Sequence, residues 1–189
     1  MLSSLANEVK DSLLTIIEGA GDVVAEARDT AKKTVLETVK GAGEVATSAM
    51  SAVADVVSGG AAAASKSAKS TTDGVAGVVE GAIDAAQEVG ADIGEAIQEA
   101  AQGAIKGVSE VGGDLGEAGV GAVKGAIAAA SDIGTDATEA TTKAVVGVIR
   151  AADEIGSEAG GVVRKALLST AALPREIIEA AIGTAEKKE

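Results

Sequence analysis

Residues 81–102 read GAIDAAQEVGADIGEAIQEAAQ, and three stretches that follow repeat this sequence with variations: GAIKGVSEVGGDLGEAGVGAVK from Gly103, GAIAAASDIGTDATEATTKAVV from Gly125 and GVIRAADEIGSEAGGVVRKALL from Gly147. The four stretches are equal in length and follow one another without a gap. Weaker copies begin at Gly19 and Gly59, and a unit shorter by four positions fills 41–58. The repeat therefore covers residues 19–168, and one structural unit is expected to recur along the chain.

Each 22-residue unit divides into two 11-residue halves with a shared pattern. Charge concentrates at positions 1, 4 and 8 of a half, as in Asp92, Glu95 and Glu99, and positions 2, 5, 6 and 9 are apolar. Eleven residues make three turns at about 3.67 residues per turn, so the apolar positions stay on one side of a nearly straight helix. The pattern predicts an all-α fold of long amphipathic helices, either extended or folded into a helical hairpin or bundle.

The composition removes most of the side chains that enzymes and metal sites use. The chain has no His, no Cys and no aromatic residue, which leaves no imidazole base, no thiolate, no disulfide and few ligands for a transition metal. The segment from Gly60 to Ser67 has the spacing of a phosphate-binding loop, but Ser65 replaces its second glycine and no strand precedes it. We therefore expect no enzyme, no cofactor and no metal.

The net charge of −13 disfavours nucleic acid as a partner, because holding a phosphate backbone requires a positive field. Charged residues recur every three to four positions, so no transmembrane span is expected. The acidic residues Glu8 and Asp11 interrupt the apolar start of the chain, which argues against a secretory signal. The expected location is the cytoplasm, either free or at the periphery of a membrane or granule.

Glycine is the main difficulty for the helix prediction. The chain contains 25 glycines, and each costs roughly 0.5–1 kcal/mol relative to Ala inside a helix. An isolated helix should therefore be marginal, and its order should depend on a lipid surface, a partner helix or another copy. Small residues also let two helix backbones come close together. The expected packing or interface residues are Leu5, Val9, Leu13, Ile16, Ile83, Ile105, Gly121, Gly125, Ile127 and Ile149.

Five segments are expected along the chain. Residues 1–18 form an amphipathic anchor helix with the densest set of large aliphatic side chains, and 19–58 form helical repeats. Residues 59–74 are rich in Gly, Ser and Thr and predict a hinge, with Thr72 or Asp73 as the N-cap of the next helix. Residues 75–168 form a second run of helical repeats, and 169–189 form a short helix after Pro174 with a charged tail.

An 11-residue amphipathic repeat grouped in units of 22 resembles the helical repeats of exchangeable apolipoproteins, synucleins and perilipins. It also looks like late embryogenesis abundant proteins. The segment EGAGDVVAEARDTAKKTVLETVKGAGEVATSAMSAVADVV, residues 18–57, is most similar to synucleins. The resemblance spans about 150 residues and rests on composition and period. It implies lipid binding for those families, and hence as an expectation for this chain.

Three functions follow as hypotheses. The first is a non-enzymatic helical-repeat protein that coats or associates with a lipid, granule or other apolar interface. The alternative is a self-assembling helical scaffold, a filament or bundle subunit whose small residues allow close helix packing. The second alternative is a stress protectant similar to late embryogenesis abundant proteins, which becomes helical only on drying or contact. The expected partner is thus either a second copy of the chain or a lipid or other apolar surface.

Overall fold

The chain is helical over the part that the structure describes. The structure is a computed structural model, and it describes residues 6–7, 10–11, 22–42, 45–67 and 70–186. The longer described segments contain the helices α2 (Val23–Ala42), α3 (Val45–Lys66), α4 (Thr71–Glu88), α5 (Ile93–Glu110), α6 (Leu115–Ile133), α7 (Ala137–Ile155), α8 (Ser157–Ser169) and α9 (Arg175–Glu186). No strand occurs among the described residues. The all-α class predicted from the repeat is therefore confirmed.

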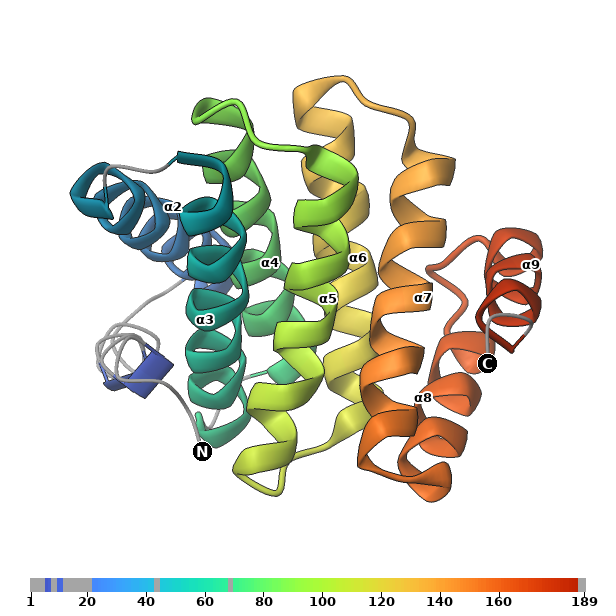
Figure 1. Cartoon of the computed structure of the whole chain (residues 1–189). Helices are drawn as coiled ribbons and strands as arrows, with labels where there is room; N and C mark the ends of the chain where they lie inside the picture. The colour runs from blue at the N-terminus through green and yellow to red at the C-terminus, as the bar shows by residue number, and fades with distance from the viewer. Residues whose placement is uncertain (1–5, 8–9, 12–21, 43–44, 68–69, 187–189) are drawn as a thin grey trace.

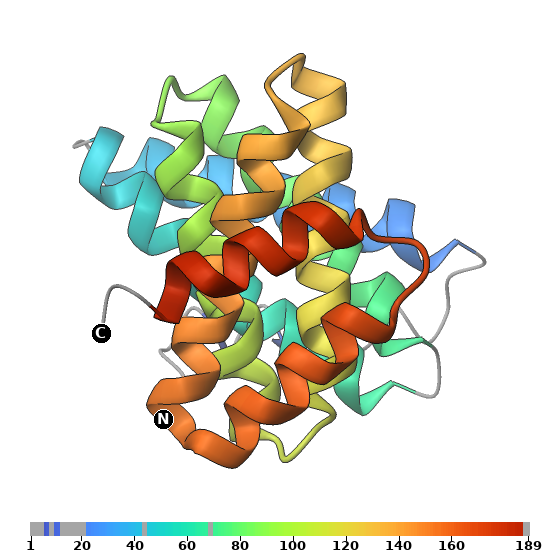
Figure 2. The ribbon, with the colours of Figure 1, turned by 90° about the vertical axis from the view of Figure 1, so that its right-hand side faces the viewer.

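The helices form two layers, and successive helices alternate between them (Figure 1). One layer contains α2, α4, α6 and α8, and the other contains α3, α5, α7 and α9. Each helix packs against the helix two places earlier in its own layer and against its chain neighbours in the other layer. Figure 2 shows α9 lying across α7 at one end of the stack. Stacking of this kind is typical of helical-repeat proteins, in which each unit contacts mainly its neighbours.

The helices in the middle of the chain begin at the interval of the sequence repeat. The first residues of α4, α5, α6 and α7 are Thr71, Ile93, Leu115 and Ala137. Short turns separate these helices at the four-residue sequences VGAD (89–92), VGGD (111–114) and IGTD (133–136), and the first residue of the third sequence, Ile133, is also the last residue of α6. One 22-residue unit of the sequence therefore corresponds to one helix and one turn.

The second and fourth residues of each turn explain why the helix ends and a new one starts. The second residues are Gly90, Gly112 and Gly134, with φ of 74°, 69° and 74°. This left-handed conformation favours glycine and closes the preceding helix, as in the hydrogen bond of 2.9 Å from the Ala91 N–H to the Ala86 carbonyl. The fourth residue is an N-cap: Asp92 Oδ1 accepts a hydrogen bond of 2.8 Å from the Glu95 N–H.

The run of helical repeats expected over 75–168 is divided into several helices. The three turns divide this segment, and α7 and α8 are separated at Gly156, which has φ of 156°. The physical reason is that the chain folds back and covers its own apolar stripe. Of the three covers expected for that stripe, a lipid surface, a partner helix or another copy, the described helices have the partner helix, and it belongs to the same chain. Three aspartates at charged positions of the repeat, Asp92, Asp114 and Asp136, are helix N-caps at the turns.

The predicted hinge at 59–74 is also wrong over most of its length. Gly59 and Gly60 are buried inside α3, which continues to Lys66, and α4 begins at Thr71. The N-cap of α4 is Ser70 rather than Thr72 or Asp73, and Ser70 Oγ accepts a hydrogen bond of 3.3 Å from the Asp73 N–H. Small side chains here serve helix packing, because a Cβ on Gly59 would overlap the backbone of Ala6.

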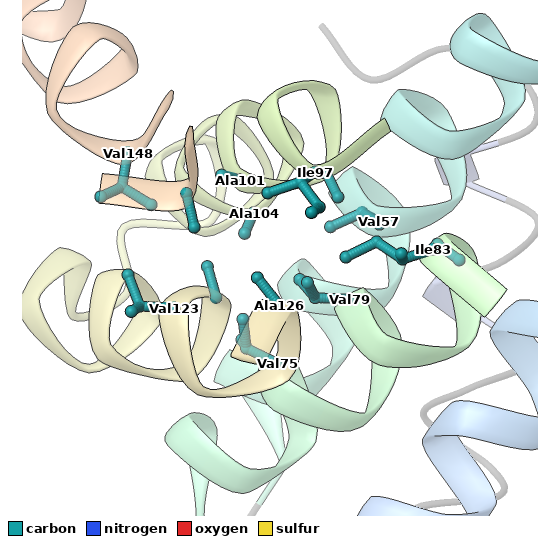
Figure 3. Packing of buried hydrophobic residues seen from close by; sticks show 14 of the residues in the cluster. Val57, Val75, Val79, Ile83, Ile97, Ala101, Ala104, Val123, Ala126 and Val148 are labelled. Atoms are coloured by element: carbon teal, nitrogen blue, oxygen red, sulfur yellow. The ribbon is translucent and has the colours of Figure 1, made fainter. Parts of the chain in front are cut away.

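Aliphatic side chains between the two layers form one continuous core (Figure 3). Figure 3 shows Val57, Val79 and Ile83 directed toward Ile97 and Ala101 across the interior. Among the largest fully buried side chains are Ile83, Ile105, Ile149, Leu167 and Ile178. Most other core residues are Ala and Val, so each helix contributes a thin apolar layer and the helices lie close together. None of the described helices is apolar over a sufficient length to cross a membrane.

Candidate functional site

Neighbouring helices of one layer touch backbone to backbone at glycines. A Cβ on Gly121 of α6 would lie 2.5 Å from the carbonyl oxygen of Thr72 in α4, and a Cβ on Gly125 would overlap the carbonyl oxygen of Ala76. The same relation holds for two other pairs: Gly77 and Gly81 of α4 against α2, and Gly103 and Gly107 of α5 against α3. Glycines spaced by four residues lie on one helix face, so each pair lets two backbones meet.

Helix α8 departs from this pattern. Lys165 and Ser169 of α8 stand 44 positions, or two repeat units, after Gly121 and Gly125. Both residues line an open groove beside α6, where a glycine pair would have brought the two backbones together. The contacts of α8 with α6 use two aliphatic side chains against α6 glycines: Val163 on Gly119 and Ala166 on Gly116. The groove is therefore the place where the repeat loses its close packing.

The groove has a volume of about 740 Å³ and is formed by three helices of one layer. The start of α4, the first half of α6 and the second half of α8 contribute, with the residues Ser70, Thr72, Asp73, Asp114, Gly116, Glu117, Val120, Lys124, Val162, Lys165, Ala166, Ser169 and Thr170. This volume is within the range of sites that hold a small molecule or a short peptide segment. Its lining combines aliphatic groups, hydroxyls and charges of both signs.

The charged residues that line the groove are Asp73, Asp114, Glu117, Lys124 and Lys165. Lys124 and Lys165 form no ion pair in the part of the chain that the structure describes. One of the acidic residues already has a structural role, because Asp114 Oδ1 accepts a hydrogen bond of 2.9 Å from the Glu117 N–H. Among the described residues, no group of three acidic side chains is arranged to hold a metal ion. The groove can therefore contact a ligand through its charged and its aliphatic side chains.

A second hollow of about 590 Å³ adjoins the groove and shares Asp114 and Val162 with it. It lies at the turns between α5 and α6 and between α7 and α8. Ile155 and Val162 line this hollow and are 45% and 46% exposed, and they are the exposed large aliphatic side chains of the described residues. Among the described residues, the exposure of large aliphatic side chains is therefore concentrated at the end of α7 and in α8.

A separate cluster of charges ties α2, α4 and α6 together around Arg28. Its guanidinium bonds Glu80 Oε1 at 2.7 Å through Nη1, and Asp84 Oδ2 at 2.9 Å through Nε and at 2.6 Å through Nη2. The Nη2 atom also donates to Asp132 Oδ2 at 2.8 Å. One cation thus pairs with three carboxylates from two helices. The second oxygen of Asp84, Oδ1, is buried and has no hydrogen-bond partner among the described residues.

Burial raises the pKa of Glu80 above its ordinary value of 4.5. The neighbouring Arg28 acts in the opposite direction, and the charges of Asp84 and Asp132 raise the pKa further. Glu80 is only 7% exposed, so its carboxylate has lost most of its contact with water. This cluster holds the stack together, and its charges are directed at one another rather than toward the groove.

The packing candidates named from the sequence fall into three groups. Ile83, Ile105 and Ile149 are fully buried between the layers, and Ile127 is partly buried against the core. Gly121 and Gly125 lie at the crossing of α6 and α4. Leu5, Val9, Leu13 and Ile16, the proposed anchor, lie outside the described residues.

Sequence reasoning missed the groove at α8, although a signal was present. The repeat has Gly at 81, 103, 125 and 147, and the next position in this series is Ser169. The absence of glycine at positions 165 and 169 marks the site where α6 and α8 stand apart. Comparisons with known proteins add no further assignment, because no family model matches the chain and no curated protein matches it.

Proposed function

We propose that the protein is a non-enzymatic helical-repeat scaffold that self-associates through its folded surface. The observation that carries this proposal is that the helices bury their apolar stripes against one another within the chain, through glycine contacts such as Gly121 on Thr72. A protein built in this way offers a rigid outer surface, and the exposed large aliphatic side chains of its described part, Ile155 and Val162, lie at the end of α7 and in α8. Rigid repeat stacks commonly act by presenting such surfaces to partners.

The test is the mass and the helix content of the full chain as functions of its concentration, without lipid. The scaffold predicts helical circular dichroism that does not change with dilution, because the core is within one chain. It also predicts a mass by sedimentation equilibrium that rises with concentration. A monomer at every concentration would refute self-association, and helix that forms only with vesicles would refute the closed scaffold.

A second candidate function, association with an apolar interface, is favoured by the phase of the repeat. Ile83, Ile105, Ile127 and Ile149 each stand one repeat unit apart, and such a unit fits six helical turns at about 3.67 residues per turn. If the turns between the helices straightened, these residues would still lie on one side of a single long helix. The stack could then open on a lipid or granule surface and turn its core side chains toward it.

A disulfide across α6 and α8 tests this opening. A Cβ on Gly116 would lie 2.9 Å from the Ala166 Cβ, so a small shift brings the pair to the separation of about 3.5–4.5 Å that a disulfide uses. The chain has no cysteine of its own, so the double variant Gly116→Cys/Ala166→Cys forms a single defined bond. The oxidised variant cannot straighten between these positions.

Opening predicts that neutral phosphatidylcholine vesicles bind the reduced double variant and that oxidation abolishes this binding. The single variants Gly116→Cys and Ala166→Cys control for the substitutions themselves. Equal binding by the oxidised and reduced protein would exclude opening between α6 and α8. Absence of vesicle binding by the unmodified chain would exclude interface association as a function.

A further inference from the structure

Among the described helices, α8 is the last of its layer (Figures 1 and 2). Its exposed face borders the groove beside α6. The exposed residues on that face follow helical spacing: Glu158, Gly161, Val162, Lys165 and Ser169. Val162, in the middle of this set, is 46% exposed, whereas the valines on the inner face of the same layer are buried. An aliphatic centre flanked by charges is the usual arrangement of a contact surface.

Gly161 provides a second observation on this face. A Cβ at this position would meet nothing within 4 Å, unlike the glycines of α4 and α6 that lie against a neighbouring backbone. Glycine inside a helix costs about 0.5–1 kcal/mol relative to Ala. No packing contact within the described chain requires glycine at position 161. The lack of a side chain there would allow the backbone of another molecule to come close to α8.

The charges of this face are complementary to themselves. Glu158 and Lys165 are two helical turns apart on one side of α8, and neither forms an ion pair in the described part of the chain. The midpoint between them falls at Gly161 and Val162. In an antiparallel pair of α8 helices, Glu158 therefore faces Lys165 of the partner subunit, and the opposite pair forms by symmetry.

From these features we infer that a second copy of this chain docks on this exposed face of α8, with the two α8 helices antiparallel about a two-fold axis at Gly161 and Val162. The inference rests on the proposed scaffold function and names its partner. The groove beside α8 gives the partner's side chains room, with Lys124 and Lys165 along it. One helix of 13 residues forms less than a standard interface, so the dimer should dissociate in the micromolar range or above.

Charge reversal on α8 tests the docking geometry. Glu158→Lys or Lys165→Glu alone replaces two attractive pairs by two repulsive ones, and each should weaken the dimer by about tenfold. The double variant Glu158→Lys/Lys165→Glu restores both pairs with reversed polarity, so its dissociation constant should return to that of the unmodified chain. Lys40→Glu, a charge reversal on the exposed part of α2, should have no effect. Sedimentation equilibrium gives the constants, and circular dichroism checks that each variant is folded.

A cysteine at the proposed axis gives an independent readout. Val162→Cys should form a disulfide-linked dimer under mild oxidation, whereas Glu176→Cys, exposed on α9, should not. Loss of dimer in both single charge variants with rescue in the double variant would establish the pairing. A dimer that ignores the α8 charges, or that links equally through residue 176, would overturn the α8 interface but leave the scaffold function in place. A monomeric unmodified chain at all concentrations would overturn both.

Discussion

At the scale of single residues, the stack depends on glycines that leave no room for a side chain. Gly125 illustrates the balance, because a helix with glycine in its interior is weaker alone but can approach the Ala76 backbone. Close approach gains dispersion contacts along both helices and weak Cα–H···O contacts at the crossing. The glycines therefore lower the stability of each isolated helix and raise that of the assembled pair.

Gly125→Ala should destabilise the protein even though Ala is the better helix former. The new methyl group would overlap the Ala76 carbonyl oxygen, and overpacking of this kind costs about 1–3 kcal/mol. Gly183→Ala, in α9, is the matched control, because a Cβ there meets nothing within 4 Å and should stabilise by up to about 1 kcal/mol. Urea unfolding followed by circular dichroism measures both changes. Equal stabilisation by the two variants would show that the α4–α6 crossing has room for a side chain.

Glu80 should make stability depend on pH in the direction opposite to most carboxylates. Its pKa is raised in the folded chain by burial, so as pH falls the folded state takes up the proton before the unfolded state does. Its contribution to stability therefore increases as pH falls from the raised pKa toward about 4.5, and decreases as pH rises. Glu80→Gln removes this dependence and keeps an amide oxygen that can accept from Arg28.

The measurement is urea unfolding of the unmodified chain and of Glu80→Gln between pH 4.5 and pH 7. The variant should gain stability relative to the unmodified chain as pH rises through this range. A constant difference between the two proteins would mean that Glu80 has the same pKa in the folded and unfolded states.

At the scale of helices and turns, the same 22-residue unit fits two structures. Its apolar positions stay in phase in one long helix, and its Gly and Asp pairs, such as Gly90 and Asp92, also fit a turn. The repeat was therefore sufficient to predict helices and to single out Gly121 and Gly125 as packing residues, but it did not decide between a continuous and a folded chain. That decision comes from contacts distant in sequence, such as Gly121 on Thr72.

Gly90→Ala tests the turn without disturbing any packing. A Cβ at Gly90 meets nothing within 4 Å, but its φ of 74° is unfavourable for Ala by about 1–2 kcal/mol. Gly90→Asn should cost less, because Asn adopts the left-handed conformation more readily. Urea unfolding of the two variants checks the order of stabilities. Wild-type stability in Gly90→Ala would indicate that the chain is helical through residue 90.

At the scale of the whole molecule, the candidate surface at α8 could not be predicted from the sequence repeat. The groove depends on how far α8 stands from α6, and that distance follows from the absence of glycine at Lys165 and Ser169. The missing glycines at positions 165 and 169 can be interpreted only when the two layers are known. Residues 121 and 165 belong to α6 and α8, which are neighbours in space but not in sequence. The regular glycines of the repeat determine how the helices pack, and their absence in α8 leaves the groove on the surface.

The two-layer arrangement predicts which insertions the stack accepts. Duplicating residues 93–136 adds α5, α6 and their turns, so that every later helix stays in its layer. The glycine pairs then meet the same backbone positions as before; the duplicated Gly103, for example, faces Gln98 as Gly147 does now. Duplicating only 93–114 adds one helix, moves α6 and every later helix into the other layer, and separates Gly121 and Gly125 from their partners in α4.

The longer insertion should give a cooperatively folded protein with a larger denaturant m-value, since more surface is exposed when it unfolds. The shorter insertion should lose cooperativity and bind a hydrophobic dye such as ANS, because its small-residue faces no longer match. Urea unfolding by circular dichroism, with dye binding in parallel, compares the two proteins directly. Equal cooperativity in both would mean that any two of these helices can pack together, and that the spacing of the glycine pairs does not assign helices to layers.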